Sequence, residues 1–251
     1  MLEHITPVIL TYNEQANIER TLNALSWANE ILVVDSFSTD QTLELCQQYK
    51  NVRIVQRQFD DPANQCNFAL QQNIKTEWVM SMDADYVVTP ELVDELKTLS
   101  NSQTTQAYEV SFNYLINGQA VVGSLYPPRT VLYKKQHANY RQDGHTQRVT
   151  IDGSVEKLDG KIQHDDRKSF DRWLNSQKKY AKQEVTKLAE ASWGQLSWPD
   201  RMRAIGIAPI LIVPYSLIIK GSILSGWPGL VYTGQRFIAE VYLQLARLKL
   251  F

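Results

Sequence analysis

The chain has 251 residues, 43% of them hydrophobic, and a formal charge of −1, which is typical of a folded protein with one large core or two modest ones. The near-neutral charge argues against a dedicated nucleic-acid binder, because such domains are strongly basic. Two well-separated cysteines, Cys46 and Cys66, make neither a disulfide framework nor a zinc site, so we expect a reducing compartment. We also expect no signal peptide, because "MLEHITPVILTYNE" carries acids and no long apolar stretch.

Strand and helix patterns alternate along the first hundred residues. Short apolar runs predict strands at 6–10, 30–36, 51–57 and 77–85. Helical spacing predicts helices at 13–25, 38–49, 62–74 and 89–99. Ser38 or Thr39 is expected to cap the second helix, and Thr89 followed by Pro90 to begin the fourth. This order predicts an α/β fold with a mostly parallel sheet and helices on both faces.

After about residue 105 the alternation stops. Antiparallel strands are predicted at 106–118 and 129–135, with Asn117-Gly118 as a hairpin turn, and a lysine-rich helix at 169–192. The uncharged stretch 204–219 is short for a spanning helix and is interrupted by prolines, so it indicates either an interfacial or re-entrant element or buried core. The stretch 230–250 predicts an amphipathic helix that is basic on its polar side.

Polar clusters follow each of the first four predicted strands, namely "TYNE" (11–14), "DSFSTD" (35–40), "RQFDD" (57–61) and "DAD" (83–85). Ligands of such sheets bind at the carboxyl ends of the strands, so these clusters are expected to line one cleft. Asp83 and Asp85 could hold a divalent cation that binds phosphate, or could simply cap a turn. No glycine-rich phosphate-binding loop follows the first strand. A metal ion is therefore expected to balance the negative charge of the phosphate groups.

The series "VILTYNE…EILVVDSFSTDQT…NFAL…WVMSMDADYVVTPEL" resembles the inverting family 2 glycosyltransferases of the GT-A fold, and most closely the bacterial branch that includes lipopolysaccharide-core glucosyltransferases. The resemblance is dense over 5–99 and continues through "YPPRTVLYKK", "GHTQRV" and "HDDRKSFDRWLNSQKKYAKQE". It implies a Rossmann-like GT-A domain, with a nucleotide-sugar-binding half at 1–100 and an acceptor-side half at 101–168. A helical, apolar and basic extension follows at 169–251, with two expectations for it: association with a membrane, or packing as core.

The resemblance also implies a nucleotide-diphosphate sugar donor, UDP-sugar in preference, and Mn²⁺ or Mg²⁺. It assigns Asp85 and Asp83 to the metal, with Asp83 nearer the ribose, and adds His164 as a further ligand. Asp35 would accept from the base's ring N–H, which suits uracil because a carboxylate only accepts. The remaining residues assigned to the nucleotide sugar are Thr11, Tyr12, Glu14, Asn67 and Arg129.

Two positions depart from the family pattern. Cys66 stands where many relatives have an arginine, and His145-Thr146 stands where core glucosyltransferases have a His-Glu pair. The general base is therefore sought among Asp143, His145 and Asp166, with Asp165 behind them. The departures also motivate an alternative, a non-catalytic nucleotide-sugar-binding or scaffold subunit. A sugar nucleotidyltransferase is disfavoured by the missing glycine-rich basic loop.

The expected acceptor is a cell-envelope glycan or a lipid-linked molecule, and the expected location is the cytoplasmic face of a bacterial inner membrane. Basic residues beside the apolar C-terminal stretch favour contact with an anionic membrane surface. No nucleic-acid partner is expected.

Overall fold

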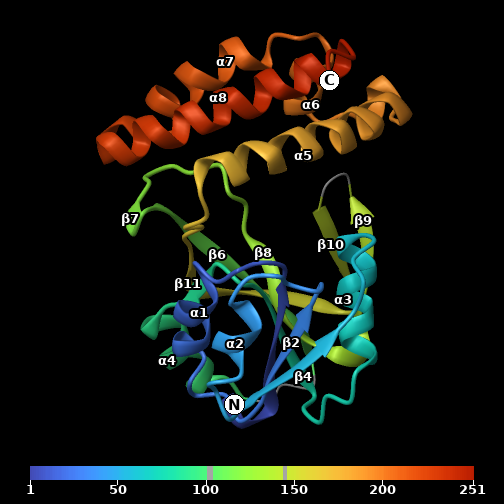
Figure 1. The fold of residues 1–251 in the computed structure, drawn as a ribbon, viewed down its shortest axis with the longest axis vertical. Helices are drawn as coiled ribbons and strands as arrows, with labels where there is room; N and C mark the ends of the chain where they lie inside the picture. Colours follow the sequence, from blue (N-terminus) through green and yellow to red (C-terminus); the bar gives the residue numbers. More distant parts are fainter. Residues whose placement is uncertain (101–103, 144–145) are drawn as a thin grey trace. The chain divides into compact units, whose positions relative to one another are not determined.

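The computed structural model describes residues 1–100, 104–143 and 146–251, and it divides into two compact units. The first, here called the sheet unit, comprises 1–113, 126–142 and 147–167. The second, here called the helical unit, comprises 114–125 and 168–251 together with Asp143 and Thr146. Figure 1 shows most of the strands within the first and the long helices of residues 168–251 within the second.

Parallel strands open the sheet, as the sequence predicts, and their spatial order is β3-β2-β1-β4. They are β1 (Ile5–Thr11), β2 (Ile31–Asp35), β3 (Val52–Gln56) and β4 (Trp78–Asp83). Successive residues of a strand point to opposite faces, so alternate side chains enter two separate apolar clusters. Ile31 and Val33 join one cluster and Leu32 and Val34 the other. Burial on both faces explains the continuous apolar runs.

Helices connect these strands: α1 (Ile18–Ala24), α2 (Thr42–Cys46), α3 (Pro62–Gln71) and α4 (Pro90–Thr98). Thr89 caps α4 by accepting from the Leu92 amide, as predicted. The cap predicted at Ser38 or Thr39 is wrong, because α2 begins only at Thr42. The Ser38 hydroxyl instead donates to Asp35, which leaves 36–41 as a polar loop.

The remaining strands extend the sheet in antiparallel fashion. They are β5 (Tyr86–Val88), β6 (Thr105–Ile116), β7 (Gln119–Ala120), β8 (Arg129–Lys134) and β11 (Ser154–His164). β8 pairs with β4 and β6, β5 pairs with β11, and β9 (Ala138–Asp143) forms a separate ladder with β10 (Thr146–Ile151). Asn117 and Gly118 have φ values of 50° and 82°, which suit the predicted hairpin turn between β6 and β7. The α/β fold with a mostly parallel core sheet is confirmed.

The helical unit is built from α5 (Phe170–Glu190), α6 (Trp198–Ala204), α7 (Ala208–Pro214) and α8 (Trp227–Arg247). A π-helical turn (Tyr215–Ile219) and a 3₁₀ turn (Ser222–Ser225) connect α7 to α8, and Gly221 between them has a φ of 75°. Three further 3₁₀ turns span Leu2–His4, Lys135–His137 and Trp193–Gln195. Along the described residues, no helix is both long enough and apolar enough to cross a bilayer.

The helix α8 carries its polar face inward. Glu240 is 4% exposed and forms an ion pair with Arg203 of α6 at 2.8 Å. The Gln244 amide and the Arg247 guanidinium donate to the Arg203 carbonyl, and so satisfy groups that the end of α6 leaves open. Phe237 and Leu248, on the apolar face, are 41% and 68% exposed. In the amphipathic stretch 230–250, the polar face is therefore turned toward the protein, and apolar side chains are exposed.

Candidate active site

The four parallel strands end side by side. Thr11 lies opposite Asp35 in the β1–β2 register, Asp35 opposite Gln56 in β2–β3, and Leu10 opposite Asp83 in β1–β4. The polar clusters that follow these strands therefore start from one edge of the sheet, as expected from the alternation of strands and helices. This edge positions the candidate site.

Asp35 is fully buried and organises this edge. Its carboxylate accepts from the Thr11 hydroxyl at 3.0 Å, the Ser38 amide at 2.9 Å, the Ser38 hydroxyl, and the Gln56 side-chain amide at 3.1 Å. A carboxylate offers about four acceptor positions, and these four donors occupy them. A uracil N–H could bond to Asp35 only by displacing one of these donors, so contact with the base stays a prediction.

The loops after β1 and β2 are held together by hydrogen bonds. The Asn13 amide donates to Ser38 Oγ at 2.8 Å, the Glu14 amide to Thr42 Oγ1 at 2.6 Å, and the Thr39 amide to Asn13 Oδ1 at 2.7 Å. Two aromatic side chains lie at the surface of these loops, Tyr12 at 54% exposure and Phe37 at 48%. The paired loops thus present aromatic surface of the kind on which a nucleobase can stack.

The paired acids lie at the junction of β4 and β5. Asp83 ends β4, and Asp85, 9% exposed, directly precedes β5. Burial raises the pKa of Asp83, and the neighbouring Asp85 carboxylate raises it further. His164 Nε2 lies 3.2 Å from Asp85 Oδ2. Burial lowers the pKa of His164, but Asp85 and Asp83 outweigh burial and raise it above its ordinary value.

An aromatic box surrounds His164, and the sequence predictions missed it. The Tyr86 and Tyr126 ring centroids lie 5.3 Å and 4.5 Å from that of His164, each close to edge-on. The two tyrosine hydroxyls hydrogen-bond to each other, and Tyr86 also hydrogen-bonds to Asp83. The Arg129 guanidinium lies over the Tyr126 ring at 5.2 Å. The box therefore holds the predicted residues Arg129 and His164 beside Asp83. The signal in the sequence is a tyrosine beside each motif. Tyr86 directly follows Asp85 in "DADY", and Tyr126 stands three residues before Arg129 in "YPPR".

The Asp83→Asn variant is expected to be more stable than wild type at pH 7 in metal-free buffer. The folded state holds the Asp83 proton more tightly than the unfolded chain, so this residue contributes stability at low pH that is lost as the pH rises through its raised pKa. Asparagine stays neutral and avoids that loss. Thermal melts should show a higher Tm, by about 2–4 °C for each kcal/mol regained. The difference should shrink at pH 4, and a lower Tm at pH 7 would contradict the prediction.

Asp83, Asp85 and His164 fit a divalent cation by the chemistry of their donors. Two carboxylates and an imidazole suit Mn²⁺, and a cation would relieve the repulsion between the acids. Over the ranges that the structure describes, no group of three or more His, Cys, Asp or Glu side chains is already arranged as a metal site. A divalent cation held by these three residues therefore stays a prediction.

Asn67 bonds to the backbone of β9. Its side-chain amide donates to the Tyr140 carbonyl at 2.8 Å and accepts from the Tyr140 amide at 2.9 Å. The adjacent Cys66 is 4% exposed, and burial together with Asp83 raises the pKa of its thiol. Asn67 thus has a structural function in the sheet unit, and its contact with the nucleotide sugar stays a prediction.

The Asn67→Ala variant is expected to lose about 1–3 kcal/mol of stability, because the Tyr140 amide and carbonyl lose their partner. Urea denaturation should show a lower midpoint with an unchanged slope. Gln71→Ala, on the exposed side of α3, serves as the control for loss of an amide. An unchanged midpoint in Asn67→Ala would show that these two hydrogen bonds add nothing to stability.

The candidate bases differ in their partners. Asp143 forms an ion pair with Lys187 of α5 at 2.9 Å, and Asp166 accepts from the Asn17 side-chain amide at 3.0 Å. Asp165 is 2% exposed and binds Arg20 and Arg167, which indicates a structural function. His145 lies outside the described residues. Of the nucleotide-side residues, Thr11 is buried against Asp35, and Glu14 accepts from Asn17 at 2.9 Å.

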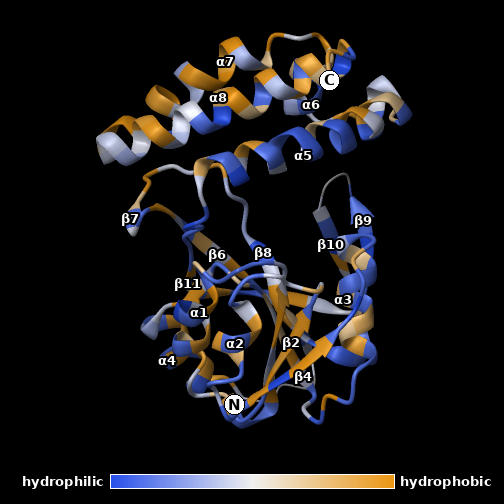
Figure 2. Ribbon diagram, viewed as in Figure 1, coloured by the Kyte–Doolittle hydropathy of each residue, from blue (hydrophilic) through white to orange (hydrophobic). Residues whose placement is uncertain are grey.

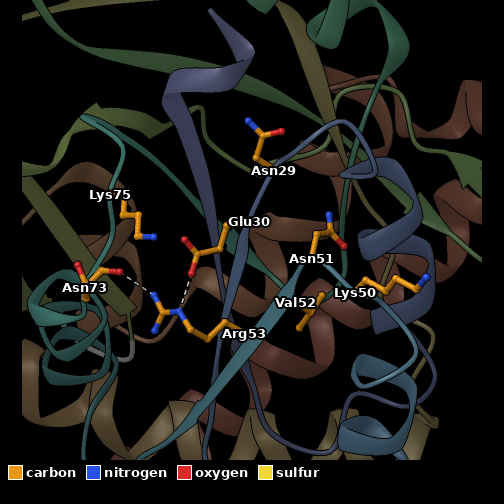
Figure 3. Close-up of a pocket in the computed structure, with 8 residues that line it drawn as sticks. All are labelled: Asn29, Glu30, Lys50, Asn51, Val52, Arg53, Asn73 and Lys75. Atoms are coloured by element: carbon orange, nitrogen blue, oxygen red, sulfur yellow. Dashed lines mark hydrogen bonds and ion pairs between the residues drawn. The ribbon is translucent and has the colours of Figure 1, made fainter.

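A surface hollow of about 510 Å³ lies elsewhere in the sheet unit. Its lining comes from residues at the amino ends of β2, β3 and β4, including Asn29, Lys50 and Lys75. Figure 3 shows Arg53 across this hollow, bonded to Glu30 and to the Asn73 carbonyl. Because ligands of parallel sheets bind at the carboxyl ends, we do not assign the sugar donor to this hollow.

Residues 6–112, which contain β1–β4 and the acid pair, match the family described as Glycosyl transferase family 2. This part of the chain is therefore similar to family 2 glycosyltransferases, and the match covers less than half of the sequence. An uncharacterized glycosyltransferase of Rickettsia bellii is 33% identical over 109 residues, which are 43% of this chain and 36% of the relative. The glycosyltransferase RP128 of Rickettsia prowazekii is 24% identical over 204 residues, which are 75% of this chain and 69% of the relative.

The chain spans little more than a third of the length of the Rickettsia bellii relative and of a similar one from Rickettsia felis. Among solved structures, S. aureus TarS 1–349 in complex with UDP-GlcNAc has a TM-score of 0.52 at 16% identity, covering 98% of this chain and 92% of that one. Glucosyl-3-phosphoglycerate synthase from Mycobacterium tuberculosis has a TM-score of 0.50 at 16% identity, covering 76% and 82%. These structures show the fold, which is that of GT-A glycosyltransferases, with C-terminal helices following the segment that matches family 2.

Proposed function

We propose that the protein is an inverting glycosyltransferase that transfers a sugar from a nucleotide-diphosphate donor, preferably a UDP-sugar, with help from Mn²⁺ or Mg²⁺. The observation that carries this proposal is the cluster of Asp83, Asp85 and His164 at the carboxyl end of β4, with both acids in the segment that matches family 2. The similar TarS structure holds UDP-GlcNAc, which supports a UDP-sugar as the donor.

Each part of the cluster has a chemical task. Asp83, Asp85 and His164 would hold the divalent cation, which when bound supplies charge neutralisation for the departing diphosphate. Arg129, fixed over Tyr126, adds positive charge near Asp83. The acceptor hydroxyl attacks the anomeric carbon on the face opposite the nucleotide, and a general base removes its proton. Asp143, His145 and Asp166 stay the candidates for that base.

The proposed acceptor is a cell-envelope glycan or a lipid-linked molecule at the cytoplasmic face of a bacterial inner membrane. Support comes from a relative in Staphylococcus aureus, the poly(ribitol-phosphate) β-N-acetylglucosaminyltransferase TarS, whose name describes transfer to a polymer. It is 26% identical over 130 residues, which are 47% of this chain and 22% of the relative. A lipopolysaccharide-core acceptor is one member of the proposed class.

A screen of UDP- and GDP-sugars with Mn²⁺, which measures the nucleotide released, tests the proposal. We expect slow hydrolysis of one UDP-sugar in water and faster release with an acceptor. Calorimetry with UDP and Mn²⁺ on the same protein separates the non-catalytic alternative. Binding without turnover on any donor would overturn transfer and favour a scaffold subunit, and absence of both would overturn the proposed donor site.

A further inference from the structure

We propose that the α7–α8 hairpin of the helical unit is a membrane-docking tip that inserts shallowly into an anionic phospholipid surface. The tip consists of large apolar side chains on α7, on the two turns after it, and at the start of α8. They are Ile210, Ile218, Ile219, Ile223, Leu224 and Trp227, each 55–80% exposed. This inference gives the proposed membrane-side function a physical surface, and its test does not depend on sugar transfer.

The packing inside the hairpin uses small and polar side chains. Ser216 and Ser222 are 1% and 0% exposed, and the Ser222 hydroxyl bonds to the Ser216 carbonyl at 2.9 Å and to Thr233 Oγ1 at 3.1 Å. At Gly229 of α8, a Cβ atom would lie 1.8 Å from the Ser222 carbonyl oxygen, so the backbones approach closely. Small residues inside and large apolar residues outside is the arrangement that helices adopt against lipid.

Water would favour the reverse arrangement, because burying a large aliphatic side chain stabilises a fold by more than burying a serine. Figure 2 shows α7 as mostly hydrophobic, whereas α5 is mostly hydrophilic. Exposed apolar surface on this scale marks a site of interaction with a protein or a membrane. Since α8 also turns Glu240 inward, the exposed face of the hairpin keeps its apolar character along its length.

The charges around the tip favour an anionic bilayer over other occupants. Residues 204–239 contain no Asp or Glu and two basic residues, Lys220 and Arg236. Lys220 is exposed within the tip, and its Nζ lies 5.7 Å from the Tyr215 ring. Trp227 is 74% exposed, and tryptophan is enriched at membrane interfaces. The hairpin helices are too short or too polar to span a bilayer, so shallow insertion is the expected mode.

Flotation of the full chain with vesicles tests this inference. Wild type should float with vesicles of phosphatidylcholine and phosphatidylglycerol, and much less with phosphatidylcholine alone. The double variant Ile218→Ser/Leu224→Ser should need about tenfold more lipid or greater for half-maximal binding. Lys220→Glu should reduce binding and remove the preference for anionic vesicles. Val155→Ser, which changes an exposed apolar residue of the sheet unit, should bind as wild type.

Three further measurements keep the inference falsifiable. Circular dichroism melts should show that the double variant is folded, and its hydrolysis of a donor in solution should equal that of wild type. Vesicles should shift the tryptophan emission of wild type to the blue, and Trp227→Phe should reduce that shift. Absence of flotation by wild type would overturn the inference. The inference would also be overturned if light scattering showed that wild type is a dimer and the double variant a monomer, while neither protein binds vesicles.

Discussion

Replacing Asp85 by alanine is expected to abolish sugar transfer and donor hydrolysis in the presence of Mn²⁺ or Mg²⁺. Asp85 Oδ2 lies 3.2 Å from His164 Nε2, and the Asp85 charge raises the pKa of Asp83, so Asp85 acts on both other members of the proposed metal set. Loss of the cation removes several kcal/mol of charge stabilisation from the departing diphosphate, equivalent to about 100-fold or more in rate. Release of UDP from the donor that the screen identifies measures the effect.

The control for this variant is Asp94→Ala, which removes an exposed carboxylate of α4. It should retain full activity and the same dependence on metal concentration. Full activity in Asp85→Ala would refute the metal assignment. If Asp85→Ala lost activity and its melting temperature collapsed as well, the loss would report on folding. We expect instead that its Tm stays near that of wild type, because removing Asp85 relieves repulsion with Asp83.

The Asp35→Ala variant is expected to lose about 2–4 kcal/mol of stability together with its affinity for UDP. Four donors, from Thr11, Ser38 and Gln56, converge on this fully buried carboxylate and would be left unsatisfied. In a chain of this size, that loss corresponds to a decrease in Tm of about 5–15 °C. Thermal melts and UDP calorimetry on the same preparation measure the two effects.

A control variant and the comparison of Tm with UDP affinity show whether Asp35 acts on stability or on nucleotide binding. Glu44→Ala, on the exposed side of α2, should change neither the Tm nor UDP binding. If Asp35→Ala lost UDP binding but kept its Tm, Asp35 would contact the nucleotide directly, as the family resemblance implies, and its four hydrogen bonds would add little to stability. A lower Tm with unchanged UDP affinity would show that other residues at this edge of the sheet, and not Asp35, bind the sugar donor.

The sequence predicted the parallel core well, because strands buried on both faces leave an unmistakable pattern. The run 30–36 contains β2, Ile31–Asp35, and all four apolar residues of that strand are fully buried. The convergence of Asp35 and Asp83 on one edge followed from the order of strands and helices alone. Thr89 and Pro90 also predicted the start of α4, since their effects are local.

Features that depend on distant partners could not be predicted in this way. Ser38 has the chemistry of a helix cap, but the carboxylate of Asp35 competes for it and delays α2 to Thr42. The amphipathic pattern of α8 predicted one polar and one apolar face, but not which of the two is buried. The ion pair between Glu240 and Arg203 buries the polar face. The aromatic box likewise needs β5, β11 and the segment before β8 to meet, and no short motif encodes that meeting.

The ladder between β5 and β11 joins the two halves of the candidate site. His164 lies opposite Tyr86, which directly follows Asp85 in the chain. The imidazole of His164 therefore reaches the carboxylate of Asp85 only when the two strands pair in this register. Side chains alternate between the faces of a strand, and an insertion of one residue between Ile162 and His164 would turn the imidazole away. Changes in chain length should therefore be tolerated at the turn around Gly153 but not along the last residues of β11. Spacing along this strand, as much as the identity of His164, would then decide whether a related chain can hold the metal.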